Sequence, residues 1–368
     1  MEASLMSAHI IDPSKIQSEL TKIWEGIDKV NKSRAALFNL VIYIEHNKRL
    51  DYIRSITQKV IEKFPSRVIF ISVDKDAPQG ELKTAVSVLT ASSGEFVITC
   101  DLIEIIASKD TQMRIPFIIL PHLIPDLPIY LLWGEDPSLK NPLLEELGSY
   151  ATRLIFDSES GSSLQEFAKG VLKQKEQFKC DVADLNWARI EPFREILQSA
   201  FSSPLKIEEL KEIKEMKICY NISESAVFCH PKVQATYLQA WIATRLNWTL
   251  KEVKAEEKCT QITYQSEKGE VKVAFETKEI SDLPMGMILS LELSTNKNAH
   301  FLFERNIKLS NQVRATYSTA EKCLVPENFI FPKGGAGQSL IKEIFHKGTS
   351  LHYLKVLDLI TKVDKNIC

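Results

Sequence analysis

The alternation of apolar and polar residues along the first half of the chain predicts strands and helices in turn. Runs rich in apolar residues at 38–44 and 67–73 predict strands, and the segment 48–64 between them has helical spacing. Strand, helix and strand in this order predict a right-handed parallel crossover. Further buried strands are predicted at 127–133 and 153–156, with helices at 16–31, 111–123, 142–150 and 164–178. This half is therefore expected to form an open α/β sheet of Rossmann-like kind.

Two alternating segments interrupt this pattern at 82–90 and 95–107. Ser92, Ser93 and Gly94 lie between them and are typical turn residues. The two segments predict a hairpin or small ribbon that is attached to the sheet.

The second half has a different pattern, in which short alternating segments follow one another with turn residues between them. A strand at 216–222 and a helix at 230–247 come first. The alternating segments that predict an antiparallel meander are 259–265, 270–277, 286–294, 299–306 and 312–319, and two helices at 337–347 and 350–363 end the chain. We expect a Rossmann-like domain at 1–183, a connecting segment at 184–204 and an α+β domain at 205–368.

The stretch 127–137, which reads LPIYLLWGEDP, has an apolar strand followed directly by a glycine and two carboxylates. Open α/β sheets place ligand or partner surfaces at the carboxyl ends of their strands. Trp133, Glu135 and Asp136 are therefore candidates for partner binding. The structural alternative is a core strand followed by a polar loop.

The connecting segment has a dense polar and aromatic start, with Asp184, Asn186, Trp187, Arg189 and Arg194. Tryptophan and arginine are enriched at binding hot spots, so these five residues are further candidates for partner binding. A linker anchored on Trp187 is the structural alternative. We expect Trp187 to be buried, and Arg189 to offer its charge to a partner or to a carboxylate such as Asp136 or Asp157.

Composition excludes several classes of protein. The 368 residues have a formal net charge of -2, which favours neither a nucleic acid nor an anionic membrane as partner. Apolar runs are too short to span a bilayer, and the start shows no signal peptide pattern. The seven cysteines, at 100, 180, 219, 229, 259, 323 and 368, form no C-x-x-C pair. Reduced thiols and a cytoplasmic location are therefore expected, with Cys368 the most exposed.

Motifs for catalysis, metal binding and cofactor binding are absent from the sequence. The turn after 38–44 has no G-x-G-x-x-G, and Gly334, Gly335 and Gly337 lack the spacing of a phosphate loop. The histidines form no metal-binding pattern. Glu135, Asp136 and Asp157 follow strands and could act as acids or bases, but such carboxylates more often cap helices. We expect no catalytic residue, no metal and no cofactor.

Three long motifs resemble the OpcA family, whose members are named as glucose-6-phosphate dehydrogenase assembly proteins. They are LPIYLLWGEDP at 127–137, RLIFDS at 153–158 and DLNWARIEPFREIL at 184–197, and FNLVIYI, PSRVIFI and WIATRLNW agree as well. The resemblance implies a non-enzymatic partner of glucose-6-phosphate dehydrogenase, which promotes the active oligomer of this entry enzyme of the oxidative pentose phosphate pathway. The family usually has a Trp pair and an Arg where this chain has Leu132, Trp133 and Gly134, and a Trp in place of Phe193.

Two other classes of function stay open from the residues themselves. One is an enzyme with a degenerate nucleotide or sugar-phosphate site at the ends of strands 38–44 and 128–133. The other is a module that binds an unrelated protein.

Overall fold

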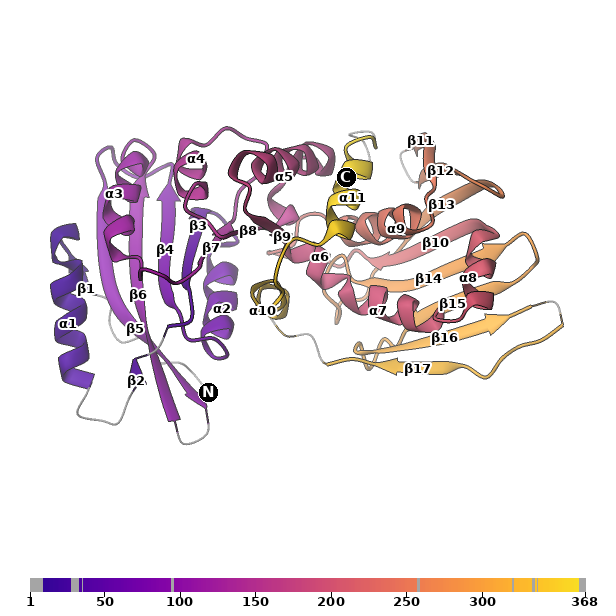
Figure 1. Cartoon of the computed structure of the whole chain (residues 1–368), viewed down its shortest axis with the longest axis horizontal. Coiled ribbons are helices and arrows are strands. Elements are labelled where there is room, and N and C mark those ends of the chain that lie inside the picture. Colours follow the sequence, from indigo (N-terminus) through magenta and orange to yellow (C-terminus); the bar gives the residue numbers. More distant parts are fainter. Residues whose placement is uncertain are drawn as a thin grey trace. The chain divides into compact units, whose positions relative to one another are not determined.

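The structure is a computed structural model that describes residues 9–27, 33–34, 36–93, 96–256, 259–319, 321–332, 335 and 337–363. The chain divides into two compact units (Figure 1). The N-terminal unit comprises Met1–Asp157, Lys173–Asp184 and Ala336–Gly348, and the C-terminal unit comprises Ser158–Leu172, Leu185–Gly335 and Thr349–Cys368.

The N-terminal unit is built on a sheet in which the described residues form nine strands. Their order is β1 (His9–Ile11), β5 (Leu82–Ser93), β6 (Phe96–Ser108), β4 (Arg67–Asp74), β3 (Asn39–Glu45), β7 (Ile129–Trp133), β8 (Arg153–Phe156) and β9 (Asp181–Asp184), and β2 (Ser33–Arg34) pairs with β6. From β6 to β9 all neighbours are parallel, whereas β5 is antiparallel to β6 and to β1. The predicted Rossmann-like open sheet is confirmed.

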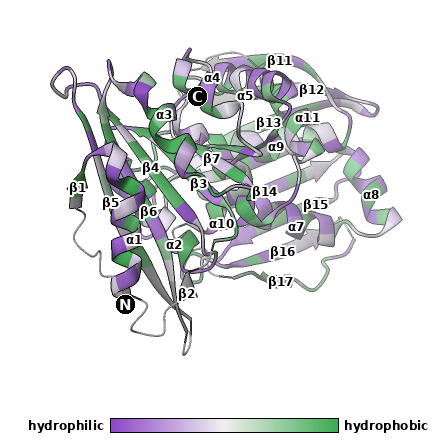
Figure 2. Ribbon diagram, turned by 60° about the vertical axis from the view of Figure 1, so that its left-hand side comes forward, coloured by the Kyte–Doolittle hydropathy of each residue, from purple (hydrophilic) through white to green (hydrophobic). Residues whose placement is uncertain are grey.

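Buried apolar residues explain why these central strands form. Leu40, Ile42, Ile69 and Ile71 are fully buried, as a strand covered on both faces requires. Figure 2 shows the apolar colour concentrated on β3, β4 and β7. The helices and 3₁₀ turns of this unit are η1 (Pro13–Lys15), α1 (Ile16–Ile27), α2 (Leu50–Ile61), η3 (Gln112–Arg114), α3 (Ile115–Ile119), η4 (Leu120–His122), α4 (Pro142–Gly148) and α10 (Gln338–Phe345).

The hairpin predicted around 82–107 forms, but the expectation of a small attached ribbon is wrong. Strand β6 pairs in parallel with β4 over seven residue pairs, so it is an inner strand of the sheet. Ser92 and Ser93 continue β5 rather than making the turn, and Gly94 lies outside the described residues. Strand β9 was not predicted, because its four residues carry two aspartates.

The C-terminal unit has a second sheet, of eight strands among the described residues. Their order is β11 (Thr249–Glu256), β12 (Cys259–Ser266), β13 (Gly269–Lys278), β10 (Ile213–Asn221), β14 (Ile288–Thr295), β15 (His300–Arg305), β16 (Gln312–Ser318) and β17 (Glu327–Ile330). The predicted meander is interrupted, because β10 lies between β13 and β14 and is parallel to β13. The sequence pattern also missed β11 and β17.

One face of this second sheet is apolar and covered by helices. Met216, Ile218 and Leu293 are buried on it, as period-2 alternation requires. The Tyr264 hydroxyl of β12 donates to Gln239 Oε1 of α9 (Val233–Arg245) at 2.7 Å, and the ring of Phe201 contacts Phe301 of β15. The other helices of this unit are η5 (Ser158–Ser160), α6 (Leu185–Arg189), α7 (Glu191–Ala200), α8 (Pro204–Lys211) and α11 (Leu351–Ile360). Helix α5 (Leu164–Phe178) groups with this unit as far as Leu172.

Helix α10 returns to the N-terminal unit, although the sequence pattern predicts it in the C-terminal domain. Arg153 of β8 forms a buried ion pair with Glu343 (2.7 Å) and donates to the carbonyl oxygens of His346 and Gly348. Gly337 has a φ of +83°, and a Cβ added there would lie 2.9 Å from Lys59 Cβ of α2, so only glycine fits. The predicted folding domains 1–183, 184–204 and 205–368 stay predictions, because spatial grouping does not test which parts fold alone.

Free thiols are described at Cys100, Cys180, Cys219, Cys229 and Cys323, and the first three are buried. The side chain of Cys259 and the whole of Cys368 lie outside the described residues, so the thiol state of all seven stays a prediction. In the described part of the chain, every helix is too short or too polar to cross a membrane.

Candidate functional site

Strands β3 and β7 end side by side in the N-terminal unit, and their last aromatic residues stack. Tyr43 pairs with Trp133 in the sheet, and the two ring centroids are 3.9 Å apart with an interplanar angle of 8°. Both side chains are fully buried. Trp133 is therefore part of the core in this structure, and its ring offers no surface to a partner.

Gly134 follows because the chain passes close to the backbone of β3. Its N–H donates to the Tyr43 carbonyl oxygen at 2.8 Å, and an added Cβ would lie 2.9 Å from that same oxygen. A larger residue would push the end of β7 away from β3. The glycine thus sets the direction in which Glu135 and Asp136 leave the strand.

Glu135 turns back over the end of β3. Its Oε1 accepts hydrogen bonds from the Glu45 N–H (3.0 Å) and from Asn47 Nδ2 (3.4 Å). Burial raises the pKa of Glu135 to about 7 and the charge of Glu45 adds to this, whereas the hydrogen bond from Glu45 and the charges of Lys75 and Arg49 oppose the rise. This carboxyl therefore occupies the turn in which a Rossmann-like protein receives a pyrophosphate.

Helix α2 begins next to this turn, and its first residues are occupied by a buried ion pair. Arg49 is the N-cap residue of α2, and its guanidinium pairs with the carboxylate of Asp157 at the end of β8. Their side chains are 7% and 0% exposed. The Arg49 N–H donates to Asn47 Oδ1 at 2.8 Å, so this donor of the helix start is also bound within the chain.

Asp136 also has a structural role. It is buried, and its Oδ1 accepts from the Ser138 N–H at 2.9 Å, which closes the turn after β7. Of the three candidates at this edge, only Glu135 keeps part of its surface exposed.

In the C-terminal unit, Asn186 and Glu159 form the centre of a buried polar cluster. Asn186 Nδ2 donates to Ser158 Oγ (2.9 Å) and to Glu159 Oε1 (3.0 Å). Glu159 Oε2 accepts from the backbone N–H groups of Cys229 and His230, at 2.8 and 3.0 Å. These bonds fix the chain that leads into α9.

Arg189 joins this cluster and is more buried than the sequence suggests. Its Nη1 donates to Asn186 Oδ1 at 2.8 Å and lies 4.0 Å from Glu159 Oε1, and its guanidinium lies over the ring of Phe228. Its side chain is only 13% exposed. Glu159 is thus a carboxylate partner of Arg189 in the structure. The expected pairing of Arg189 with Asp136 or Asp157 stays a prediction. Asp184, the last residue of β9, is fully buried as well.

Trp187 is buried, as predicted, and anchors α6 within the C-terminal unit. It is 5% exposed, its ring lies 5.4 Å from that of Tyr353, and the Arg194 guanidinium lies 3.5 Å from its ring centroid. Arg194 Nη1 also donates to the Trp187 carbonyl oxygen at 2.7 Å. Trp187 and the half-buried Arg194 are thus held together at the start of α7.

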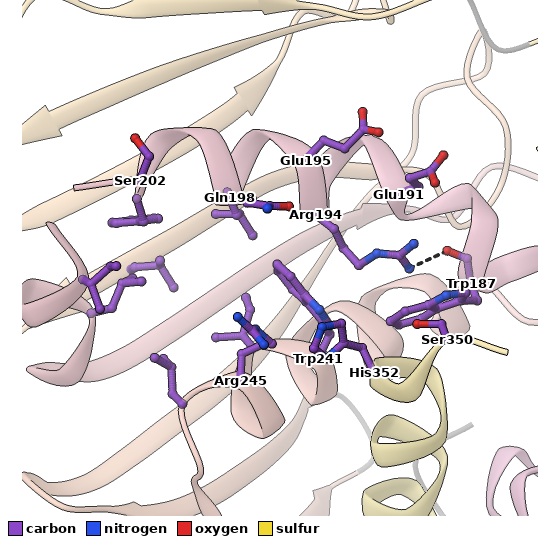
Figure 3. A pocket seen from close by; sticks show the side chains of 17 residues that line it. Trp187, Glu191, Arg194, Glu195, Gln198, Ser202, Trp241, Arg245, Ser350 and His352 are labelled. Atoms are coloured by element: carbon purple, nitrogen blue, oxygen red, sulfur yellow. Dashed lines mark hydrogen bonds between the residues drawn. The ribbon is translucent and has the colours of Figure 1, made fainter. Parts of the chain in front are cut away.

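A cavity of about 710 Å³ opens beside this anchor (Figure 3). Helix α7 lines one side, and α9 and the start of α11 line the other. Its apolar lining comprises Leu197, Phe201, Ile207, Leu210, Ile242, Leu246 and Leu293. Its polar and aromatic lining comprises Trp187, Glu191, Arg194, Glu195, Gln198, Ser202, Trp241, Arg245, Ser350 and His352.

Sequence reasoning found Trp187 and Arg194 in this cavity but missed Trp241, Arg245 and His352. Trp241 and Arg245 stand four residues apart on α9 and so share one face of that helix. That spacing was the available signal, but the third residue lies on a helix far along the sequence. Burial lowers the pKa of His352, and the nearby charges of Arg245, Lys355 and Arg194 lower it further.

No group of three or more metal-ligating side chains is present in the part of the chain that the structure describes.

Two family models match the chain in succession, and both describe a glucose-6-phosphate dehydrogenase subunit of the OpcA family. Residues 57–171 match the model of its N-terminal domain. Residues 180–327 match the model of its C-terminal domain. Together they cover most of the chain, so the chain belongs to this family.

Curated relatives agree with these models. Each is named putative OxPP cycle protein OpcA. The protein of Synechocystis sp. is 29% identical over 192 residues, which are 50% of this chain and 38% of the relative. That of Synechococcus elongatus is 26% identical over 236 residues, 60% of this chain and 48% of the relative. The protein of Nostoc punctiforme is 27% identical over 220 residues, which are 58% of this chain and 43% of the relative. The chain thus spans less than half the length of the curated relatives it matches.

A solved structure with a similar fold is the 3-ketoreductase KijD10 from Actinomadura kijaniata, which was determined with TDP-benzene and NADP. The TM-score is 0.51 at 9% identity, and the match covers 89% of this chain and 96% of that chain. This likeness concerns the fold alone.

Proposed function

Because the chain belongs to the OpcA family, we propose that it is a non-catalytic partner of glucose-6-phosphate dehydrogenase in the oxidative pentose phosphate pathway. In this proposal the chain binds the enzyme in the cytoplasm and promotes its active oligomer. The match to both domain models of the family supports the partnership.

The carboxyl edge of the N-terminal sheet carries the non-catalytic part of the proposal. A dinucleotide needs a glycine-rich turn and free N–H groups at the helix start. Here the turn is Glu45–Arg49, Glu135 accepts the Glu45 N–H, and Asp157 pairs with Arg49. The N–H and the cation that could receive a pyrophosphate here are thus already occupied within the chain, which supports a binding protein better than a dehydrogenase.

The surface that contacts the enzyme is also part of the proposal. Of the eight predicted candidates, Trp133, Asp136, Asp184, Asn186 and Trp187 are buried. Glu135, Arg189 and Arg194 keep partial exposure and are the remaining candidates for direct contact. The buried ones act by holding these residues in place.

The test mixes the purified chain with glucose-6-phosphate dehydrogenase of the same organism and follows NADPH formation and sedimentation. We expect a larger sedimenting species and a higher rate, while the chain alone forms no NADPH. Serum albumin at the same concentration is the control for crowding. If the rate and the sedimentation both stay unchanged at micromolar concentrations, the partnership is wrong.

The runner-up function is an enzyme with a degenerate nucleotide or sugar-phosphate site at the ends of β3 and β7. Thermal unfolding with NADP and NAD separates the two functions, because a ligand present at 100 times its Kd adds about 2.7 kcal/mol to the unfolding free energy. We expect no shift of the melting temperature with either dinucleotide. A clear shift would favour the enzyme.

A further inference from the structure

The cavity of the C-terminal unit has one cationic end, to which three helices contribute. Arg194 comes from α7, Arg245 from α9 and His352 from the first turn of α11. Figure 3 shows the Arg245 and His352 side chains close to one another, beside Trp241. The side chain of Lys355, one turn further along α11, adds to the positive potential at His352.

Arg194 at this end is bound to Trp187, whereas the other two residues have no described side-chain partner. Among the described residues, neither Arg245 nor His352 has a hydrogen bond or ion pair, in contrast to the arginines at 49, 153 and 189. The carboxylates that line the cavity, Glu191 and Glu195, both come from α7. Like charges held together without an anion raise the energy of the site, and a bound anion would lower it.

The start of α11 supports the same conclusion. Ser350 is its N-cap and accepts the Tyr353 N–H, and both Ser350 and His352 line the cavity. The first N–H groups of a helix have no partner within the helix, and its dipole favours negative charge there. Helix α11 has ten residues, so this contribution adds to the charge of the Arg245 side chain.

The remainder of the cavity is suited to an uncharged body. The Trp241 ring lies near Arg245 and His352, and the lining of the cavity includes apolar residues such as Leu246 and Leu293. Gln198 on α7 and Ser202 just after this helix offer hydrogen bonds to hydroxyl groups. The volume of about 710 Å³ lies in the range of small-molecule sites and is far too large for an anion alone.

We propose that this cavity binds a phosphorylated small molecule, with its phosphate between Arg245, His352 and the start of α11 and its ring or sugar body against Trp241. The site goes beyond the proposed partnership and does not depend on it. It gives the chain a way to respond to a metabolite.

The first experiment measures binding by calorimetry with inorganic phosphate, phenyl phosphate and glucose 6-phosphate, and with phenol and glucose as their uncharged counterparts. We expect each phosphorylated body to bind at least tenfold more tightly than its counterpart and more tightly than inorganic phosphate. Comparison of the phenyl and glucose arms tells whether the site prefers an aromatic or a hydroxylated body. If no phosphorylated probe binds at millimolar concentration, the proposal is wrong.

Variants then locate the site. Arg245→Gln is expected to weaken binding at least tenfold, because it removes a charged donor. The matched control is Arg314→Gln on β16, an exposed arginine of the same unit that does not line the cavity. An equal loss in both variants would show non-specific attraction and overturn the proposal. The proposal would also be overturned if an acidic peptide bound to the protein and none of the small probes did.

Sulfate tests the role of His352, since its charge is constant between pH 5 and 8. Protonated His352 adds a cation, so sulfate affinity is expected to rise as the pH falls through the lowered pKa of this histidine. The other charged groups around this site are Arg194, Arg245 and Lys355 and the two carboxylates of the cavity lining, Glu191 and Glu195. His352→Asn separates them, since it should remove the pH dependence that His352 causes. An unchanged profile in this variant would contradict the assignment.

Discussion

Two arginines near helix ends, Arg49 in the N-terminal unit and Arg245 in the C-terminal unit, have opposite surroundings. Arg49 is buried and paired with Asp157, beside a turn that Glu135 fills. Arg245 is exposed at a cavity, and its charge acts on His352 together with those of Lys355 and Arg194. The place where this fold usually binds an anion is therefore internally neutralised here. The unused positive charge lies instead among the helices of the other unit.

The largest effect that would sharpen this comparison is expected from Arg49→Ala. Removing one partner of a buried pair leaves Asp157 with an uncompensated charge and should cost about 3–5 kcal/mol of unfolding free energy. Urea unfolding measures it, with Arg314→Ala as the exposed control. A loss close to that of the control would mean that the edge of the sheet is not held by this pair.

A smaller, pH-dependent effect is expected from Glu135→Gln. The pKa of Glu135 in the folded protein is raised to about 7, so the folded state holds this proton over a pH range where the unfolded state has lost it. Stability from this group is therefore greatest below its ordinary pKa and falls as the pH rises towards 7. Glutamine has no proton to lose and can still accept the Glu45 N–H.

The stability of Glu135→Gln relative to the original protein should thus increase by about 1–3 kcal/mol between pH 5 and pH 8. Melting temperatures across this range measure the difference. The control is Glu276→Gln, which changes an exposed carboxylate. Its stability relative to the original protein should be the same at all these pH values. A flat difference for Glu135→Gln as well would place its pKa near the ordinary value.

The smallest effect on stability is expected from Arg245→Gln. This arginine is exposed and has no ion pair among the described residues, so its loss should change the unfolding free energy by no more than about 0.5 kcal/mol. Urea unfolding beside Arg49→Ala gives the direct contrast. A loss of several kcal/mol would mean that Arg245 is a structural cation, and the difference between the two arginines would disappear.

Much of the fold was predictable, since burial on both faces leaves a continuous apolar run that is visible in the sequence. The strands at 38–44 and 67–73 match β3 and β4 closely. Strands β9 and β17 were missed, because short strands with polar residues have no such pattern. The insertion of β10 between β13 and β14 was also invisible, because periodicity gives the face of a strand but not its neighbour.

The candidate site was predictable only where its residues stand together in the sequence. Trp187 and Arg194 belong to one aromatic and charged motif, so they were found. The other end of the cavity joins α9 to the start of α11, which no local pattern connects.

The sequence by itself determined the Rossmann-like sheet, the alternating second half and the family, because these depend on local periodicity and on long motifs. Only the tertiary structure decided which residues are buried and which charged side chains have partners. Trp133 and Asp184 are buried, although they stand in motifs that suggest a surface. Arg245 is exposed and has no ion pair among the described residues, although its sequence motif does not show that its charge is unpaired. The physical reason is that burial and charge pairing depend on residues brought together from distant parts of the chain.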